Sequence, residues 1–279
     1  MYLRPGTLDE ALQTLARTPA TILAGGTDLF PAFTAGQLKG TVLDISAISE
    51  LKGIRTSPGF FHIGARTTWT ELLRAPLPRG FDGLRAAARE IGSIQIQNQA
   101  TIAGNICNAS PAADGVAALL SLDAELTLAS ANATRILSLA DFIQGNRKTL
   151  RQPDEMLTSI RIPRPWEHAA STFLKLGARR YLVISIVMVA VNLQIDPDRR
   201  VRQAAVSVGS CSAKAVRLSA LEQALAGATA GPSLPELVDP AHFSPISPID
   251  DIRATAEYRL EAAQTLVRRA LLDCASKAA

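Results

Sequence analysis

The 279-residue sequence predicts an α+β fold in two domains. In the N-terminal part, short apolar segments with the composition of strands alternate with short amphipathic helical segments. In the C-terminal part, two long β-type segments are joined by a polar turn and followed by helical segments. Pro153, Pro163 and Pro165 separate the two patterns. We therefore predict one domain over residues 1–167 and a second over residues 168–279.

The first domain begins with a helix signature. Thr7 and Glu10 form a capping box, in which each side chain accepts a hydrogen bond from the other residue's backbone amide, and apolar residues then follow at helical spacing to about residue 16. A strand is predicted next at 20–24, followed by a short helix that runs toward Thr34 and has Thr27 or Asp28 as its N-cap. The remaining elements of this domain are strands at 41–45 and 61–65, helices at 68–73, 84–91 and 116–120, and paired strands at 125–129 and 134–137.

The second domain is predicted from two strong strand patterns. Residues 182–195 and 201–211 are rich in β-branched and apolar residues, and the polar segment 196–200 joins them as a hairpin. Helices are predicted at 218–226 and 250–272, on either side of a proline-rich connection (227–248). The last helix has an apolar face formed by Ile252, Ala256, Leu260, Ala263, Val267, Ala270 and Leu271.

Composition and charge exclude several classes of protein. The 47% of hydrophobic residues is ample for two cores, and residues 1–5 lack the charged and apolar segments of a signal peptide, so none is expected. The longest apolar run, 182–193, is shorter than the ~20 residues that span a bilayer, so a cytoplasmic protein is expected. The net charge of +4 is distributed over arginine pairs with no basic stripe among aromatic residues, which argues against nucleic-acid binding.

The cysteines and histidines predict neither a metal site nor a disulfide framework. Cys107, Cys211 and Cys274 lie far apart without a C-x-x-C motif. The three histidines are isolated, and none has a Cys or Ser partner at a spacing typical of a catalytic triad. If the protein works together with iron–sulfur clusters, another chain must hold them.

Two glycine-containing segments without Lys or Arg are the strongest functional signal. Residues 22–29 read Ile-Leu-Ala-Gly-Gly-Thr-Asp-Leu, and residues 101–114 read Thr-Ile-Ala-Gly-Asn-Ile-Cys-Asn-Ala-Ser-Pro-Ala-Ala-Asp. Glycine lets the backbone approach a ligand where a Cβ atom would clash, and free amides then bind phosphate oxygens. The first segment alone is also compatible with an ordinary strand-to-helix turn. Together the two loops predict a large polyphosphate cofactor held from two sides.

These residues resemble the two FAD-binding signatures of the flavoprotein (medium) subunit of molybdenum hydroxylases, the family of xanthine dehydrogenase and aerobic carbon monoxide dehydrogenase. Residues 23–29, 101–105 and 109–114 carry the resemblance. The segments at 147–150, 154–157 and 160–163 are similar to the end of the family's flavin domain, and the segment 251–259 is similar to its C-terminal helix. In order and spacing, the similarity covers nearly the whole chain.

The resemblance implies a two-lobed FAD-binding domain of the PCMH (vanillyl-alcohol-oxidase-like) type, with two α/β lobes, followed by a C-terminal antiparallel sheet with helices. It implies non-covalent FAD in this chain, a molybdenum cofactor in a large partner subunit, [2Fe-2S] clusters in a small partner subunit, and a dimer of such heterotrimers. Electrons would pass from the clusters through FAD to NAD+, a quinone or oxygen. The chain alone would not hydroxylate a substrate.

The resemblance also places individual residues at the cofactor: Ile22, Leu23, Ala24, Gly25, Gly26, Thr27, Asp28, Leu29, Thr101, Gly104, Asn105, Ser110, Asp114, Leu157, Lys175 and Tyr181. An ionised Asp114 only accepts hydrogen bonds, which suits a ribose or ribityl hydroxyl. Tyr181 is a candidate for stacking on the flavin ring, from the start of the long strand. The alternatives are a core leucine at position 157, a solvated lysine at 175 and a core aromatic at 181.

Two departures from the family pattern leave alternative functions open. The chain has Ala103-Gly104 where the family usually has two glycines, and Gln97-Asn98 where Arg-Asn is common. If residue 103 needs a positive φ, alanine costs roughly 1 kcal/mol there. A cofactor-free interaction subunit and a stand-alone flavoenzyme of the same fold are therefore the alternatives to an electron-transfer subunit.

Overall fold

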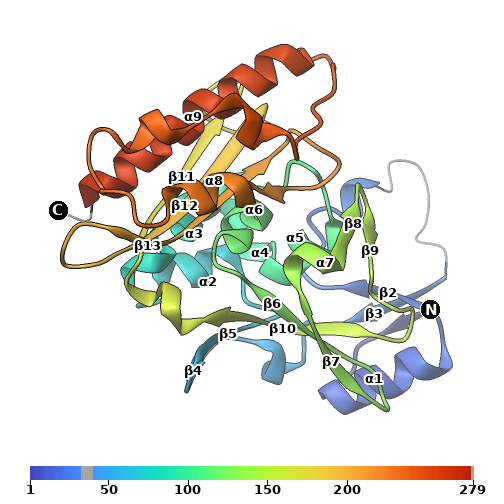
Figure 1. Cartoon of the computed structure of the whole chain (residues 1–279). Helices are drawn as coiled ribbons and strands as arrows, with labels where there is room; N and C mark the ends of the chain where they lie inside the picture. Colours follow the sequence, from blue (N-terminus) through green and yellow to red (C-terminus); the bar gives the residue numbers. More distant parts are fainter. Residues whose placement is uncertain (33–39, 278–279) are drawn as a thin grey trace. The chain divides into compact units, whose positions relative to one another are not determined.

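The computed structural model describes residues 1–32 and 40–277, which form two compact units of mixed helix and sheet (Figure 1). The first unit consists of Met1–Ala75, Ser93–Ala109 and Ala124–Ile162, and the second consists of Pro76–Gly92, Ser110–Asp123 and Pro163–Ala279. Each unit is thus assembled from three separate segments of the chain. The predicted α+β class is confirmed.

The first unit contains two main sheets. The parallel sheet has the strand order β1 (Tyr2–Leu3), β3 (Thr41–Asp44), β2 (Ala20–Leu23). The five-stranded sheet has the order β4 (Ile54–Ser57), β5 (Phe60–Gly64), β10 (Met156–Pro163), β6 (Glu125–Ala129), β7 (Thr134–Ser138). The predicted pairing of the last two strands is confirmed, because β6 and β7 are antiparallel neighbours. Strands β8 (Ile143–Gly145) and β9 (Lys148–Thr149) form a small separate ladder.

The helices of the first unit begin at the caps that the sequence contains. They are α1 (Leu8–Arg17), α2 (Trp69–Arg74), α4 (Ile94–Gln99), α5 (Ile102–Asn108) and α7 (Leu139–Phe142). The capping box of Thr7 and Glu10 is confirmed, and Thr68 with Glu71 forms a second one before α2. Each box satisfies two amides that a helix N-terminus otherwise leaves without partners.

The second unit is built on one antiparallel sheet. Its strand order is β11 (Ala170–Leu176), β12 (Val187–Ile195), β13 (Val201–Gly209), β14 (Val216–Arg217), and the predicted hairpin turn between β12 and β13 is confirmed. Helix α9 (Ala256–Lys277) lies on one face of the sheet, and α3 (Asp82–Glu90) with α6 (Asp114–Leu120) lies on the other (Figure 1). Helix α8 (Ser219–Leu225) packs against β13. Because both faces are covered, the first seven residues of β12 are buried, which explains why all of them except Asn192 are apolar.

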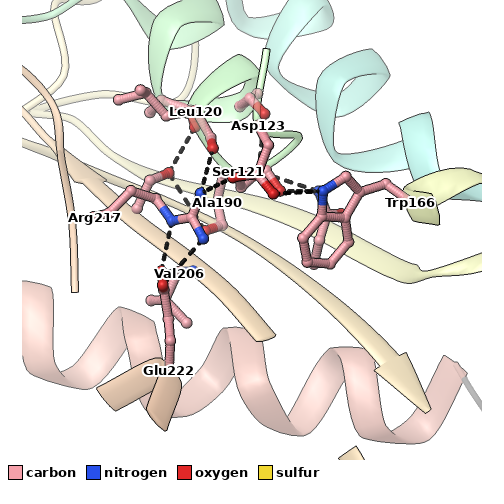
Figure 2. Close-up of polar contacts among 12 residues, drawn as sticks. Leu120, Ser121, Asp123, Trp166, Ala190, Val206, Arg217 and Glu222 are labelled. Carbon is pink, nitrogen blue, oxygen red and sulfur yellow. Dashed lines mark hydrogen bonds and ion pairs between the residues drawn. The ribbon is translucent and has the colours of Figure 1, made fainter. Parts of the chain in front are cut away.

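A polar network fixes α6 to this sheet (Figure 2). The Arg217 guanidinium donates to the Leu120 carbonyl oxygen over 2.8 Å and forms ion pairs with Asp123 and Glu222. The Trp166 indole donates to the same Asp123 carboxylate over 2.8 Å. Burial lowers the pKa of Arg217, but its bonds to the two carboxylates outweigh this effect and raise it, so the guanidinium stays charged. The C-terminal end of α6 is therefore held in place, and with it the helix that begins at Asp114.

Two predicted elements begin later in the structure than in the prediction. The strand predicted from residue 182 begins at Val187, because the chain turns at Leu182, whose φ is +52°. The last helix begins at Ala256, since the Thr255 hydroxyl and the Asp250 carboxylate accept the amides of its first turn. Ile252 therefore lies outside the helix and is 97% exposed.

The two loops also differ from their predictions. Residues 102–108 of the second loop form α5, with Thr101 as its N-cap. After the first loop the structure has a 3-10 helix at Phe30–Ala32, whereas Thr34 lies outside the described residues. Within residues 1–32 and 40–277, none of the helices has the length and apolarity needed to cross a membrane.

Candidate functional site

The first glycine loop, residues 24–29, packs against the residues that lead into the second loop. A Cβ atom on Gly25 would lie 1.9 Å from the carbonyl oxygen of Gln99, the last residue of α4, so only glycine allows this approach. Gly26 has a φ of +71°, which glycine adopts without strain. Within the first unit, the structure thus places the first loop beside the residues that precede Thr101, where the second predicted segment begins.

The backbone amides of this loop are available to a ligand. Among residues 1–32 and 40–277, no atom accepts a hydrogen bond from any amide between Ala24 and Leu29. The loop follows β2, which contains Ile22 and Leu23, and it is partly exposed at Gly25, Gly26 and Thr27. Successive unpaired amides form a concave site for anions such as a pyrophosphate. The first loop therefore fits the phosphates of the FAD that the resemblance implies.

The second loop presents the capped N-terminus of α5. The Gly104 amide donates to the Thr101 hydroxyl over 3.0 Å. Ala103 lies in the first helical turn and does not have a positive φ, so the strain considered for this position does not arise. The residue that adopts the left-handed conformation is Ala109, with a φ of 47°, where α5 ends.

The side chain of Asn105 is a second feature, after the amides of the first loop, that is compatible with a bound cofactor. Its side-chain oxygen Oδ1 is buried and has no hydrogen-bond partner among the described residues. An unsatisfied buried polar group costs about 1 to 3 kcal/mol, which a donor on a ligand offsets. The orphaned oxygen of Asn105 and the free amides of the first loop are thus compatible with a polar cofactor that both donates and accepts hydrogen bonds.

In the second unit, Asp114 and Lys175 form a buried ion pair. The Lys175 ammonium lies 2.7 Å from Asp114 Oδ2, and the Ser185 hydroxyl donates to Asp114 Oδ1 over 2.6 Å. Both side chains of the ion pair are less than a tenth exposed. Burial raises the pKa of Asp114, whereas Lys175 and Ser185 lower it. The solvated lysine considered for position 175 is therefore excluded, and Asp114 already has two protein partners.

The sequence did not reveal two partners in this cluster. Ser185 lies 71 residues from Asp114, and the carbonyl oxygen of Glu90 accepts a weak hydrogen bond of 3.5 Å from Lys175. Both residues lie in elements predicted from the sequence, the strand at 182–195 and the helix at 84–91, but neither pattern indicates a contact with Asp114 or Lys175. Only the packing of α3, α6 and β11 in one unit brings these groups together.

The remaining predicted residues occupy different environments. Ser110 accepts the Ala112 amide in the turn before α6. Leu157 is 3% exposed in β10, so its side chain lies in the core. Tyr181 is 66% exposed in the loop between β11 and β12, with the Arg180 guanidinium 5.5 Å from its ring centroid. The core aromatic considered for position 181 is excluded, and the ring is accessible to a ligand.

The described residues contain no other group that resembles a catalytic or metal centre. No cluster of three or more His, Cys, Asp or Glu residues that could hold a metal ion occurs in residues 1–32 and 40–277. Cys107 is exposed on α5, and Cys211 and Cys274 are buried without disulfide partners.

Comparison with known proteins agrees with this geometry. A family model described as the FAD binding domain in molybdopterin dehydrogenase matches residues 1–165, and one described as the CO dehydrogenase flavoprotein C-terminal domain matches residues 172–274. The chain is 32% identical to the nicotinate dehydrogenase FAD-subunit of Eubacterium barkeri over 98% of this chain and 95% of that protein.

It is 30% identical to the xanthine dehydrogenase FAD-binding subunit of Escherichia coli O157:H7, over 99% of this chain and 96% of that protein. Among solved structures, a chain of reconstituted CO dehydrogenase from Oligotropha carboxidovorans superposes with a TM-score of 0.91 at 28% identity, over 99% of this chain and 97% of that chain.

Proposed function

Because the chain belongs to the FAD-binding medium subunits of the molybdenum hydroxylases, we propose that it carries electrons from the iron–sulfur clusters of a partner subunit through FAD to an external acceptor. The observation that best supports this role is the row of amides from Ala24 to Leu29, which have no acceptor among the described residues and lie beside Gln99, just before the second loop. Such a row binds phosphates without a lysine or arginine.

Within each unit, the residues that the resemblance assigns to FAD have a distinct proposed task. The first loop binds the pyrophosphate, and Asn105 accepts a hydrogen bond from the cofactor. Lys175 contributes a buried positive charge whose position Asp114 determines, and Tyr181 provides an accessible aromatic face. Bound FAD supplies the capacity to accept and release one or two electrons, and the protein supplies binding, orientation and electrostatics.

The partners in this proposal are a large subunit with the molybdenum cofactor and a small subunit with [2Fe-2S] clusters, assembled as a dimer of heterotrimers. The names of the similar proteins, which describe FAD-subunits and medium chains, support a multi-subunit enzyme. We place the complex in the cytoplasm, where thiols such as those of Cys107, Cys211 and Cys274 stay reduced.

The first prediction tests this division of tasks. The FAD-loaded chain alone should be reduced by dithionite but should show no hydroxylase turnover. Adding the molybdenum and iron–sulfur subunits should make reduction of its flavin depend on the hydroxylated substrate, as followed by the loss of visible flavin absorption. A purified chain without any flavin absorption supports a cofactor-free interaction subunit instead. A chain that oxidises a substrate without partners supports a stand-alone flavoenzyme.

The second prediction is that FAD is bound without a covalent bond. Neither loop places a histidine at the cofactor, and Cys107 is the one exposed thiol near the second loop. Acid precipitation of the purified protein should therefore release all the yellow colour into the supernatant. Colour that remains in the pellet of the natural protein, but not in the pellet of Cys107→Ser, would reveal a thioether to the flavin.

A further inference from the structure

The segment that leads into α9, residues 249–258, has three large apolar side chains at the surface (Figure 1). Ile249 is 68% exposed, Ile252 is 97% exposed and Tyr258 is 49% exposed. The apolar pattern of the sequence predicts Ile252 on a face of the last helix, but in the structure it lies at the tip of a turn outside that helix. Single exposed apolar residues are ordinary, whereas three on one short segment favour an interaction site.

Hydrogen bonds and ion pairs hold this turn in one conformation. The Asp251 amide donates to the Ala254 carbonyl oxygen over 3.1 Å, and Asp251 Oδ1 accepts the Arg253 amide over 2.8 Å. Asp251 also forms ion pairs with Arg253 and Arg259, at 3.0 and 2.7 Å. The bond from the Arg253 amide, together with the two guanidinium groups, lowers the pKa of Asp251 to about 2. The carboxylate therefore stays charged at neutral pH, and the turn stays closed.

The turn is also fixed to the core of the second unit. Arg259 is 3% exposed, and its guanidinium donates to the carbonyl oxygens of Ile186 and Ser210 over 2.7 and 3.1 Å. Ile186 directly precedes β12, and Ser210 directly follows β13. Before the turn, the Ser247 amide donates to the Cys211 carbonyl oxygen over 3.0 Å. The turn is therefore a rigid base for its apolar side chain, and binding a partner there costs little conformational entropy.

The charged groups beside these apolar side chains are mainly acidic. Asp250 and Glu257 are exposed, and neither has a cationic partner within 4.0 Å among the described residues. The two arginines of the segment are already paired with Asp251. Because interfaces join surfaces of complementary charge, the matching surface has an apolar pocket for Ile252 and a border of Lys or Arg residues.

The size of the segment argues against pairing of two copies of the chain through it alone. A stable interface buries about 800 Å² on each partner, which is more than three side chains supply. An anchor within a larger interface fits better, because a few central side chains carry most of the binding free energy of such an interface. Large and permanent interfaces are typical of the subunits of one enzyme.

We propose that residues 249–258 dock on a partner subunit of the enzyme, with Ile252 inserted into an apolar pocket that Lys or Arg residues border. The identity of the partner rests on the proposed function, whereas the rigid turn and its exposed side chains do not. Ile249 and Tyr258 surround the anchor and exclude water from it, and Glu257 pairs with the basic border of the pocket.

The test is calorimetric titration of the full FAD-loaded chain with the molybdenum and iron–sulfur subunits. Ile252→Ser should weaken association about 10- to 100-fold, as expected for loss of a central interface residue, and should leave the urea unfolding midpoint unchanged. Glu257→Lys should weaken association less and reduce its dependence on salt. The matched controls, Leu272→Ser and Glu236→Lys, change exposed residues of the same unit outside the segment and should associate as the natural protein does.

Equal association of Ile252→Ser and the natural chain would overturn the proposal and leave the proposed function standing. Absence of any association, in a chain whose visible absorption shows bound FAD, would contradict both the anchor and the proposed partners. A chain that holds no FAD but associates with the same dependence on Ile252 contradicts electron transfer and supports the anchor. Sedimentation of the isolated chain adds one more outcome: a dimer that Ile252→Ser dissociates would make a second copy the occupant and overturn docking on a partner subunit.

Discussion

Replacing Gly25 with alanine is expected to cause one of the two largest losses in this protein, affecting both stability and FAD affinity. The new Cβ atom would lie 1.9 Å from the carbonyl oxygen and 2.7 Å from the carbonyl carbon of Gln99. Both are backbone atoms at the junction of α4 and α5, so no flexible side chain is able to move aside. Overpacking of this kind costs about 1 to 3 kcal/mol, and we expect the upper end of that range.

The same substitution should separate the two loops that we assign to FAD. The affinity for FAD should fall about 100-fold, which corresponds to about 3 kcal/mol. Gly6→Ala is the matched control, since its Cβ atom would meet only Glu10 Oε2 at 3.8 Å, and it should change stability by less than about 0.5 kcal/mol. Urea unfolding and FAD titration measure both quantities. If the two variants behave alike, the Gly25 contact does not organise the site.

Replacing Asp114 with alanine is the other change with a large expected effect. It would leave the Lys175 ammonium buried without a counter-ion, and breaking a buried ion pair in this way costs about 3 to 5 kcal/mol. It would also leave the Ser185 hydroxyl without its acceptor. Both the free energy of unfolding and the FAD affinity should decrease, because Lys175 would no longer be held in position.

Two further variants distinguish an effect on the ion pair from a general loss of structure. Asp141→Ala removes an exposed carboxylate that caps a short helix through Ser138, and it should have a much smaller effect on FAD affinity. The double variant Asp114→Ala with Lys175→Met removes both charges and should recover most of the stability, because no isolated charge remains. It should still bind FAD weakly. Natural FAD affinity in the double variant would contradict a role for this pair in cofactor binding.

The local features of the protein could be predicted from the sequence because the interactions that cause them span only a few residues. The capping box of Thr7 and Glu10, the pairing of β6 with β7 and the hairpin between β12 and β13 all follow from neighbouring residues. The glycine loop at Gly25-Gly26 was visible for the same reason. From the residues alone, physical reasoning predicted only a large polyphosphate cofactor. The resemblance of these motifs to a known family identified that cofactor as FAD.

The ends of the elements were less predictable, because competing interactions decide them. The apolar pattern of residues 182–195 is continuous, but the left-handed turn at Leu182 delays the strand to Val187. The helical pattern from residue 250 is interrupted by a turn in which Asp251 binds Arg259 and Arg253. Residues 102–108 looked like a loop, since Gly104, Asn105 and Asn108 suit turns as well as the capped helix that the segment forms.

By itself the sequence determined the α+β class, the two candidate loops and the absence of a recognisable catalytic motif. Only the tertiary structure decided that Asp114 pairs with Lys175 and Ser185, that α3 and α6 cover the sheet of the second unit, and that Arg259 binds the carbonyl oxygens of Ile186 and Ser210. These contacts join residues that are tens of positions apart. Periodicity along the chain shows which face of an element is apolar, but not which distant element packs against that face or which buried charges pair with each other.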